Sequence, residues 1–262
     1  MLDSGKSLPA PPTDVTLPNR DPVAAFAGEP LEVLRANGML TVQFDHPLTD
    51  EEFLALGAEL GTAAAETAPA VREQVEHEVI LNLVSRYQRT DDNDLQPFAR
   101  NYLSLHTEGS GRLLPEQPRY IVLMCCEPGD DTSAAQTTVV PMREVADRLS
   151  PRQREVLSAT SYRGKDHAVL RFEGDRPIFS FRDFLGSTME WTCTADTEPP
   201  EVDEAIRALL AAMYDESTGI RGVRWSRGLL LVIDNARVFH GRTAGSDGGS
   251  VRTRHLKRLR IN

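Results

Sequence analysis

Residues 101–110 read Asn-Tyr-Leu-Ser-Leu-His-Thr-Glu-Gly-Ser, and the rest of the chain can be interpreted from this stretch. Apolar and polar side chains alternate along it, which is the period of a β-strand. Residues two apart on a strand point to the same face, so we expect His106 and Glu108 to project together. An imidazole and a carboxylate on one wall supply two ligands of a metal site; the alternative is an ordinary surface pair.

His240 is the candidate for a third ligand. It follows an apolar run at residues 228–233, which predicts a buried strand, and a turn at residues 234–236. Two imidazoles and one carboxylate form the ligand set of non-haem Fe(II) oxygenases, which leaves open positions on the metal for substrates. The sequence therefore predicts an iron site made of His106, Glu108 and His240.

Arg254 is the candidate for an anion-binding residue beside this site. If residues 243–250 form the loop of a β-hairpin, residue 254 on the returning strand (251–261) lies opposite or beside His240. A guanidinium there can bind a carboxylate through two parallel hydrogen bonds. We expect it to hold the far carboxylate of a dicarboxylic acid whose other end chelates the metal. The Arg-rich end of the chain otherwise reads as a strand with solvated arginines.

At these residues the chain resembles the clavaminate synthase-like branch of the Fe(II)/2-oxoglutarate-dependent oxygenases, which is related to taurine dioxygenase. Arg254 follows His240 by fourteen residues, which matches the usual spacing in that family. The glutamate of His106-Thr-Glu108 favours this branch over relatives that carry an aspartate. The resemblance spans roughly residues 30–262, and the segments that carry it are 103–108, 119–126, 135–139, 229–242 and 254–258.

The resemblance implies a role for each candidate residue. The three metal ligands would bind Fe(II), with 2-oxoglutarate and O2 as cosubstrates, and Arg254 would bind the C5 carboxylate of 2-oxoglutarate. Thr138 resembles the threonine that assists this arginine, although its neighbour Thr137 could take the same part. Arg182 and Asp183 follow a late strand where relatives often place residues that contact the substrate; the alternative for both is a solvent-facing loop charge.

The implied reaction is oxidation of an unactivated C–H bond in a free amino acid, an amino-acid derivative or a natural-product intermediate, with hydroxylation as the leading outcome. Desaturation or oxidative cyclisation on the same iron is the alternative. A catalytically silent cupin-like binding protein and a zinc hydrolase with the same ligands are weaker alternatives. Halogenation is disfavoured, because halogenating relatives replace the carboxylate that Glu108 supplies. Residues 86–101 depart from the pattern by which relatives often hold an amino acid, so the substrate stays open.

Composition excludes several other classes of protein. The formal net charge of −10 over 262 residues argues against binding of nucleic acid, which requires a basic surface. No apolar run approaches the roughly 20 residues needed to cross a membrane. The three cysteines, two of them adjacent, suit neither a disulfide framework nor a zinc site. We expect a cytoplasmic protein with a small-molecule, amino-acid-like substrate; the sequence does not indicate an oligomeric state.

Many short strands, with helices at the front and middle of the chain, predict a mixed α/β, mainly β fold built as an antiparallel barrel or double-sheet roll. The resemblance implies a double-stranded β-helix core (jelly-roll, cupin-like) with flanking helices. Residues 1–22 contain five prolines and are expected to form a flexible N-terminal arm. Residues 23–262 are expected to form a single oxygenase domain.

Local signals predict the ends of several elements. Thr49 followed by Glu52 predicts a capping box at the start of a helix, and Gly38 predicts the end of the helix before it. The turn at residues 173–175 predicts a hairpin between the strands on either side. The apolar spacing of residues 202–214 predicts a helix.

Overall fold

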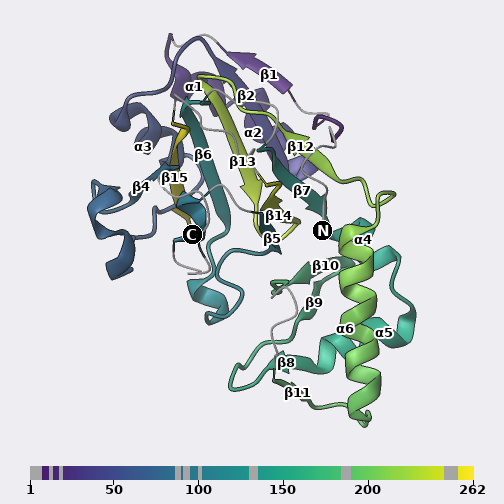
Figure 1. Ribbon diagram of the computed structural model, residues 1–262. Coiled ribbons are helices and arrows are strands. Elements are labelled where there is room, and N and C mark those ends of the chain that lie inside the picture. The colour runs from purple at the N-terminus through teal and green to yellow at the C-terminus, as the bar shows by residue number, and fades with distance from the viewer. Residues whose placement is uncertain are drawn as a thin grey trace.

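The computed structural model describes residues 8–11, 14–17, 20–85, 90, 95–99, 102–129, 135–183, 190–244 and 253–262. The acidic residues 91–94, most of residues 86–101 and most of the predicted loop at residues 243–250 lie outside these ranges. The architecture is mixed α/β and mainly β, which confirms the predicted class: two sheets pack against each other and helices cover their outer faces (Figure 1).

The larger sheet in the described part of the chain consists of β1 (Asp14–Leu17), β2 (Met39–Phe44), β13 (Leu229–Asp234), β6 (Tyr120–Glu127), β15 (His255–Ile261), β4 (Ile80–Val84) and β3 (Val75–Glu76), in that spatial order. Neighbouring strands are antiparallel, except β1 and β2. Strand β13 is buried on both faces, as its unbroken apolar run predicts. Leu231 faces the second sheet, whereas Val232 packs toward the helices.

The smaller sheet, over the same described ranges, consists of β12 (Arg221–Val223), β7 (Thr137–Pro141), β14 (Val238–Arg242) and β5 (Leu103–His106), in that order. It packs face to face with the larger sheet, because Val139 and Val238 share one buried cluster with Leu123 and Leu231. Strand β14 is an inner strand, paired with β7 on one side and β5 on the other.

The outer face of the larger sheet is covered by α1 (Pro22–Phe26), α2 (Glu29–Asn37) and α3 (Asp50–Ala58). Phe26 and Phe53 bury their rings in the cluster between these helices and the sheet. Local sequence sets the helix ends as predicted. Thr49 and Glu52 form the capping box of α3, and Gly38 ends α2 in the left-handed conformation, with φ 78°.

A second group of elements packs on the outer face of the smaller sheet and gathers at one end of the molecule (Figure 1). It contains α4 (Met142–Asp147), α5 (Pro151–Ala159), α6 (Pro199–Tyr214), the paired strands β8 (Thr160–Tyr162) and β11 (Trp191–Cys193), and the paired strands β9 (Leu170–Glu173) and β10 (Arg176–Phe179). The last pair is the predicted hairpin. Short 3-10 turns occur at η1 (Pro69–Gln74), η2 (Gln96–Phe98) and η3 (Leu114–Glu116).

The hairpin predicted between residues 237–242 and 251–261 is wrong. β14 belongs to the smaller sheet and β15 to the larger one, so the chain crosses from one layer to the other. β14 is already paired on both edges by β7 and β5, and β15 by β6 and β4. Neither strand therefore has a free edge for the other. Within residues 1–22, where an arm is expected, β1 pairs in parallel with β2 and extends the larger sheet.

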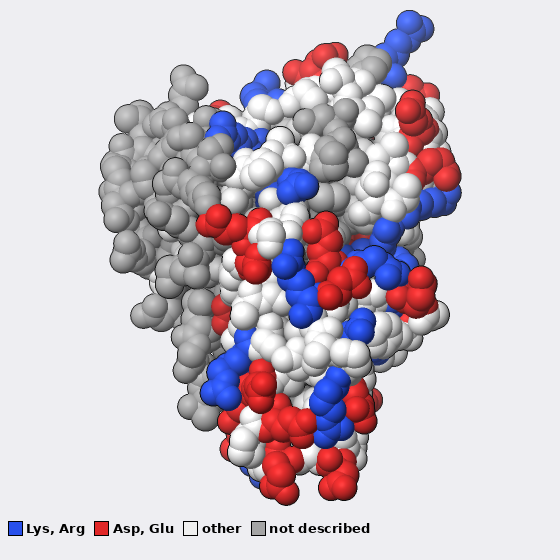
Figure 2. Space-filling model, turned by 90° about the vertical axis from the view of Figure 1, so that its right-hand side faces the viewer, with Lys and Arg blue, Asp and Glu red and all other residues white. Residues whose placement is uncertain are grey.

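The surface charge is mixed on the side of the molecule that carries α5 and α6. Figure 2 views this side and shows acidic and basic side chains interleaved across it. One ion pair, between Nε of Arg152 and Oε1 of Glu201 at 2.5 Å, joins the two helices. The longest described helix, α6, has 16 residues, and no helix in the described ranges combines the length and apolarity that crossing a bilayer requires.

Candidate metal centre

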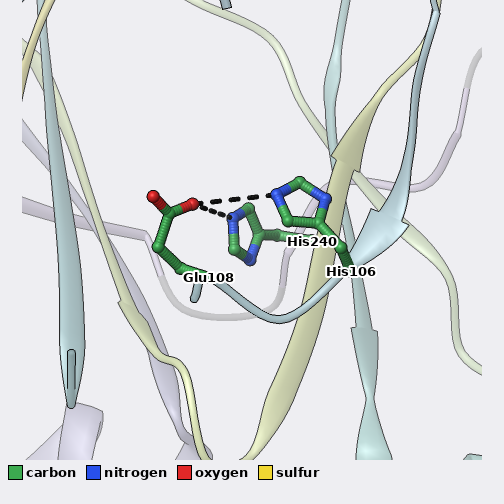
Figure 3. A group of neighbouring side chains, drawn as sticks. All are labelled: His106, Glu108 and His240. Atoms are coloured by element: carbon green, nitrogen blue, oxygen red, sulfur yellow. Dashed lines mark ion pairs between the residues drawn. The ribbon is translucent and has the colours of Figure 1, made fainter. Parts of the chain in front are cut away.

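The side chains of His106 and Glu108 meet that of His240, which is far from both in the sequence, between the two sheets (Figure 3). His106 ends β5 and His240 lies in β14, where the two residues are directly paired. Glu108 follows β5 by two residues. The Nε2 atoms of His106 and His240 lie 3.8 and 3.9 Å from Oε2 of Glu108. One ligand atom from each residue lies within 4.8 Å of the others, which is close enough to share one metal ion.

Both imidazole rings direct their Nε2 atoms toward the carboxylate of Glu108. Nδ1 of His106 lies 2.7 Å from the carbonyl oxygen of Ser104 and therefore donates a hydrogen bond, which leaves the lone pair on Nε2. Nδ1 of His240 is buried and has no hydrogen-bond partner among the described residues, while Nε2 faces the centre. Fixing one ring nitrogen by a hydrogen bond is the usual way in which proteins orient a metal-binding histidine.

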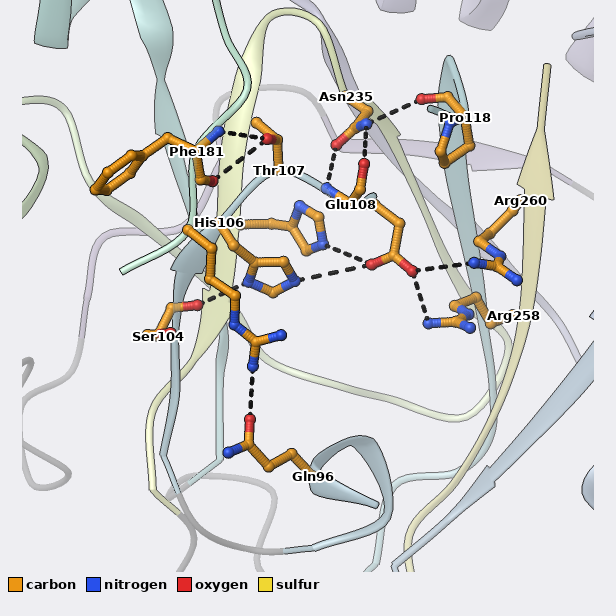
Figure 4. Close-up of polar contacts among 12 residues, drawn as sticks. Gln96, Ser104, His106, Thr107, Glu108, Pro118, Phe181, Asn235, Arg258 and Arg260 are labelled. Carbon is orange, nitrogen blue, oxygen red and sulfur yellow. Dashed lines mark hydrogen bonds and ion pairs between the residues drawn. The ribbon is translucent and has the colours of Figure 1, made fainter. Parts of the chain in front are cut away.

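The two carboxylate oxygens of Glu108 have different neighbours (Figure 4). Oε2 faces the imidazoles, whereas Oε1 lies 3.4 Å from Nη1 of Arg258 and 3.6 Å from Nη1 of Arg260. The guanidinium groups orient the carboxylate and leave Oε2 for a cation.

The backbone of Glu108 is held by Asn235, in the turn after β13 (Figure 4). The Glu108 amide donates to Oδ1 of Asn235 at 2.8 Å, and Nδ2 of Asn235 donates to the carbonyl oxygens of Glu108 at 3.1 Å and Pro118 at 2.9 Å. The amide of Thr107 donates to the carbonyl oxygen of Phe181 at 2.9 Å. These bonds extend the strand geometry beyond the end of β5, so the carboxylate of Glu108 stays on the same face as the side chain of His106.

Burial and neighbouring charges set the protonation states of the ligands. Burial raises the pKa of Glu108, but the charge of Arg258 and the two imidazoles outweigh it, so this pKa lies well below its usual range. Burial, together with the adjacent His106, lowers the pKa of His240 to about 3. At neutral pH Glu108 is therefore anionic and His240 neutral, which are the forms that bind a metal cation.

The donor set fits a divalent transition metal. Two imidazole nitrogens and one carboxylate oxygen converge from one side, which is the arrangement of a three-ligand site with open positions. Calcium and magnesium prefer all-oxygen surroundings and do not match these donors.

The trio of His106, Glu108 and His240 borders a cavity of about 430 Å³ between the sheets, a volume typical of small-molecule sites. Leu81, Ile121 and Leu123 of the larger sheet form part of its apolar wall. The charged part of the lining is dominated by arginine: Arg112, Arg182, Arg242, Arg254, Arg258 and Arg260, against Glu66 and Glu108.

Arg254 lines this cavity, but it lies just before β15 of the larger sheet rather than on a strand beside His240. The two residues border the same space because the inner faces of both sheets enclose it. Arg242 is also buried here and donates to the carbonyl oxygens of Pro97 at 3.2 Å and Gln96 at 2.9 Å. Burial, with the charge of Arg254 nearby, lowers the pKa of Arg242 to about 9.

Thr137, rather than Thr138, lies on the cavity wall. Side chains alternate along β7: Val139 belongs to the cluster between the sheets and Val140 to the outer cluster. Thr138 therefore lies on the outer side, paired with Gly241 of β14. The structure thus brings Thr137, and not Thr138, to the cavity that Arg254 lines.

Arg182 and Asp183 are placed differently. Arg182 lines the cavity, and its Nη2 donates to Oε1 of Gln96 at 2.8 Å. Asp183 is buried and does not line the cavity; its Oδ2 accepts a hydrogen bond from the hydroxyl of Tyr214 at 2.7 Å. Arg182 can therefore contact a ligand, whereas Asp183 has its partner within the protein.

Sequence reasoning missed Asn235, Glu66 and the individual positions of Arg258 and Arg260. A signal was present for the two arginines. Residues two apart on a strand share a face, and Arg258 and Arg260 follow Arg254 by four and six residues, so all three are expected on the same face. Glu66 lies in an irregular segment, and Asn235 looks like an ordinary turn residue, so neither gives a pattern to follow.

Solved structures share this fold. The PvcB protein from Pseudomonas aeruginosa is 20% identical, with a TM-score of 0.70 over 98% of this chain and 90% of that chain. An asparagine oxygenase solved with Fe(II), 3-hydroxyasparagine and succinate is 18% identical, with a TM-score of 0.60 over 91% of this chain and 77% of that chain.

A third structure of this fold is a mutant of the non-haem iron oxygenase OrfP in complex with (3S)-hydroxy-L-Arg. It is 18% identical, with a TM-score of 0.65 over 91% of this chain and 81% of that chain. At such identities the likeness shows the fold alone.

Sequence comparison is more specific. No curated protein matches the sequence significantly. The family model described as "Taurine catabolism dioxygenase TauD, TfdA family" matches residues 10–260, nearly the whole chain, and agrees with the resemblance found in the motifs. The chain belongs to the TauD, TfdA dioxygenase family.

Proposed function

We propose that this protein is an Fe(II)- and 2-oxoglutarate-dependent oxygenase that oxidises an unactivated C–H bond of a small molecule. The observation that carries the proposal is the convergence of His106, Glu108 and His240 on one point of a cavity that Arg254 also lines. We further propose that the two sheets form a double-stranded β-helix, of the jelly-roll or cupin type, within a single domain over residues 23–262.

Each part of the cavity has a role in this proposal. His106, Glu108 and His240 hold iron, Arg254 binds the C5 carboxylate of 2-oxoglutarate, and Thr137 lines the same cavity. The bound iron, with 2-oxoglutarate and O2, supplies the oxidising chemistry. The protein orients the target carbon toward the open side of the metal and excludes water through its apolar wall. Glu108 leaves no room for a halide in place of the carboxylate, which favours oxygenation over halogenation.

Hydroxylation is the reaction outcome that we favour, with desaturation or oxidative cyclisation as the alternative. Two proteins of the same fold support this choice. The asparagine oxygenase was solved with 3-hydroxyasparagine, and the OrfP mutant with hydroxyarginine. A second structure of PvcB, 19% identical to this chain, is described as that of an Fe, alpha-ketoglutarate dependent oxygenase from an isonitrile synthetic pathway. We therefore place the substrate among amino acids, their derivatives and natural-product intermediates.

The cavity charge narrows the substrate further. Six arginines against two glutamates give the lining an excess of positive charge, in a chain whose net charge is −10. The cosubstrate occupies Arg254, and Glu108 belongs to the metal. Arg182 then remains on the wall near the metal ligands, because its backbone pairs with that of His106. This charge excess favours a substrate with at least one acidic group.

The test is succinate release by wild-type protein supplied with Fe(II), ascorbate, 2-oxoglutarate and O2. The panel should contain amino acids, N-acylated amino acids and carboxylic acids without an amino group. We expect succinate above the no-substrate control for an acidic compound, and a product that has gained one oxygen. Loss of two hydrogens would indicate desaturation or ring closure. Succinate that never exceeds the no-enzyme control would overturn the proposal, and activity without 2-oxoglutarate or O2 would indicate a hydrolase.

A further inference from the structure

A second carboxylate in the cavity wall shares its partners with the metal ligand Glu108. Nη2 of Arg258 lies 2.8 Å from Oε1 of Glu66, and Nη2 of Arg260 lies 2.6 Å from Oε2 of Glu66. Each guanidinium therefore bridges two carboxylates, with Nη2 on Glu66 and Nη1 toward Glu108. The side chain of Glu66 is 2% exposed and those of the arginines are 12% and 8% exposed, so water screens these charges weakly.

Backbone hydrogen bonds to β15 position Glu66 beside Arg258 and Arg260. The segment before it runs along the end of β15, where the amide of Ala64 donates to the carbonyl oxygen of Arg260 at 2.7 Å. The approach begins at Gly61, which has a φ of 150° and lies so close to the chain end that an added Cβ would stand 2.2 Å from the oxygen of Asn262. A glycine is therefore required at the point where the segment carrying Glu66 joins the sheet.

The four side chains balance in charge. Two guanidiniums and two carboxylates sum to zero, although Glu108 must also serve the metal. Without Glu66, both arginines would turn to Glu108 alone and one positive charge would be left beside the metal site. Arg260 makes the longer of the two contacts with Glu108, at 3.6 Å against 3.4 Å for Arg258, so it depends more on Glu66 for its counter-charge. A surplus charge and a stronger pull on the ligand carboxylate would both oppose a bound cation.

We propose that Glu66 is a positioning residue for the metal centre: it neutralises one of the two arginines and aims both, so that Glu108 keeps Oε2 for the metal ion. The inference rests on the proposed function, since it requires the trio to bind a metal. It assigns an effect on metal affinity to a residue that touches neither metal nor imidazole.

The test is anaerobic titration of the metal-free protein with Co(II), followed by absorption of the bound ion, and with Fe(II) plus 2-oxoglutarate, followed by the charge-transfer band. Glu66→Gln should weaken metal binding by about 10- to 100-fold, the range found when partners of metal ligands are removed. Glu66→Asp, which keeps the charge, should recover part of this loss. Glu73→Gln is the matched control, because Glu73 is exposed on η1, and it should bind metal like wild type.

A double variant separates charge from packing. Glu66→Gln combined with Arg260→Gln leaves Arg258 and Glu108 as a balanced pair, so metal affinity should return close to that of wild type. Wild-type affinity in Glu66→Gln would overturn the proposal, as would a double variant as weak as the single one. A raised KM for substrate with unchanged metal affinity would also overturn it, since Glu66 would then contact the substrate.

Two further results keep the test decisive. If Glu66→Gln does not fold, as judged by circular dichroism, the balanced double variant decides alone: affinity near wild type supports the proposal, and a loss of about tenfold or more overturns it. Wild-type protein that binds neither Co(II) nor Fe(II) would overturn the proposed function itself. Wild-type binding and turnover, with no effect of Glu66→Gln, would overturn the positioning role only.

Discussion

Nδ1 of His106 donates a hydrogen bond to the carbonyl oxygen of Ser104, two residues earlier on the same strand, at 2.7 Å. Ser104 is itself buried, and its hydroxyl donates to the carbonyl oxygen of Asp183 at 2.6 Å. The candidate ligand His106 is therefore oriented by a hydrogen bond within its own strand. The residues Asp183 and Ser104 belong to the support of the site rather than to its surface.

His106→Ala should abolish turnover and weaken Co(II) or Fe(II) binding by roughly a hundredfold or more, because it removes a ligand rather than a partner of one. Metal titration and succinate formation measure the two effects. His46→Ala changes an exposed histidine outside the cavity and should leave both unchanged. Full activity in His106→Ala would refute the metal centre.

Arg254→Ala should raise the KM for 2-oxoglutarate by about 10- to 100-fold, the cost of losing hydrogen bonds to a charged group. The kcat at saturating 2-oxoglutarate should fall less, and the Co(II) affinity without cosubstrate should stay the same. Steady-state kinetics with varied 2-oxoglutarate measure the split. Arg72→Ala, an exposed arginine on η1, is the control. An unchanged KM in Arg254→Ala would assign cosubstrate binding to another residue.

Asn235→Ala should destabilise the protein by about 3 kcal/mol, because it leaves buried backbone groups of Glu108 and Pro118 without their partners. Metal affinity should also fall, since the turn that carries Glu108 loses its anchor. Denaturant unfolding and Co(II) titration measure the two effects. Asn235→Asp should be similarly harmful, because a carboxylate cannot donate. A stable Asn235→Ala variant with normal metal binding would contradict this reading.

Gly241→Ala should destabilise the protein by about 1–3 kcal/mol, the usual cost of overpacking. A Cβ at this position would lie 2.7 Å from the carbonyl oxygen of Leu103, on the strand that carries the first histidine. The strands β14 and β5 would have to separate. Gly111→Ala is the matched control, since its Cβ would meet no atom within 4 Å. Thermal unfolding of both variants should show a loss only in the first.

The metal-free protein should lose stability as pH falls below about 6.5. Burial and His106 lower the pKa of His240 to about 3 in the folded state, against an ordinary value of 6.5. Between these values the unfolded chain binds a proton that the folded chain does not, so the stabilisation is complete above 6.5 and is lost toward 3. Denaturant unfolding at about pH 7.5 and about pH 5 measures this. His240→Asn should show a shallower pH dependence; equal slopes would contradict the prediction.

Part of the candidate metal centre could be predicted from sequence because its information is local. Strand alternation places His106 and Glu108 on one face. The apolar run at residues 228–233 predicts the buried strand β13, which precedes His240. The capping box at Thr49 and Glu52 is equally local, and it is confirmed. Features of this kind can be predicted because they depend only on the geometry of neighbouring residues in one strand or helix.

Other features could not be read in this way because they depend on which sheet a strand joins. Nothing in the residues around Arg254 reveals that the strand after it enters the larger sheet, so the hairpin prediction failed although Arg254 lines the same cavity. Thr137 and Thr138 are adjacent on one strand and point to opposite faces, so an error of one residue in the prediction selects the wrong face. The contacts of Glu66 arise only when an irregular segment meets the end of β15.

The pairing of His106 with His240 in one antiparallel ladder has a practical meaning for protein design. The separation of the two rings is dictated by interstrand backbone bonds, not by connecting loops. Histidines grafted onto an opposed position of an unrelated antiparallel sheet would therefore reproduce the spacing of the two rings, whereas the glutamate would also need an anchor such as Asn235. The relative position of the two imidazoles is thus set by the pairing of β5 and β14, and the surrounding cavity decides which molecules reach them.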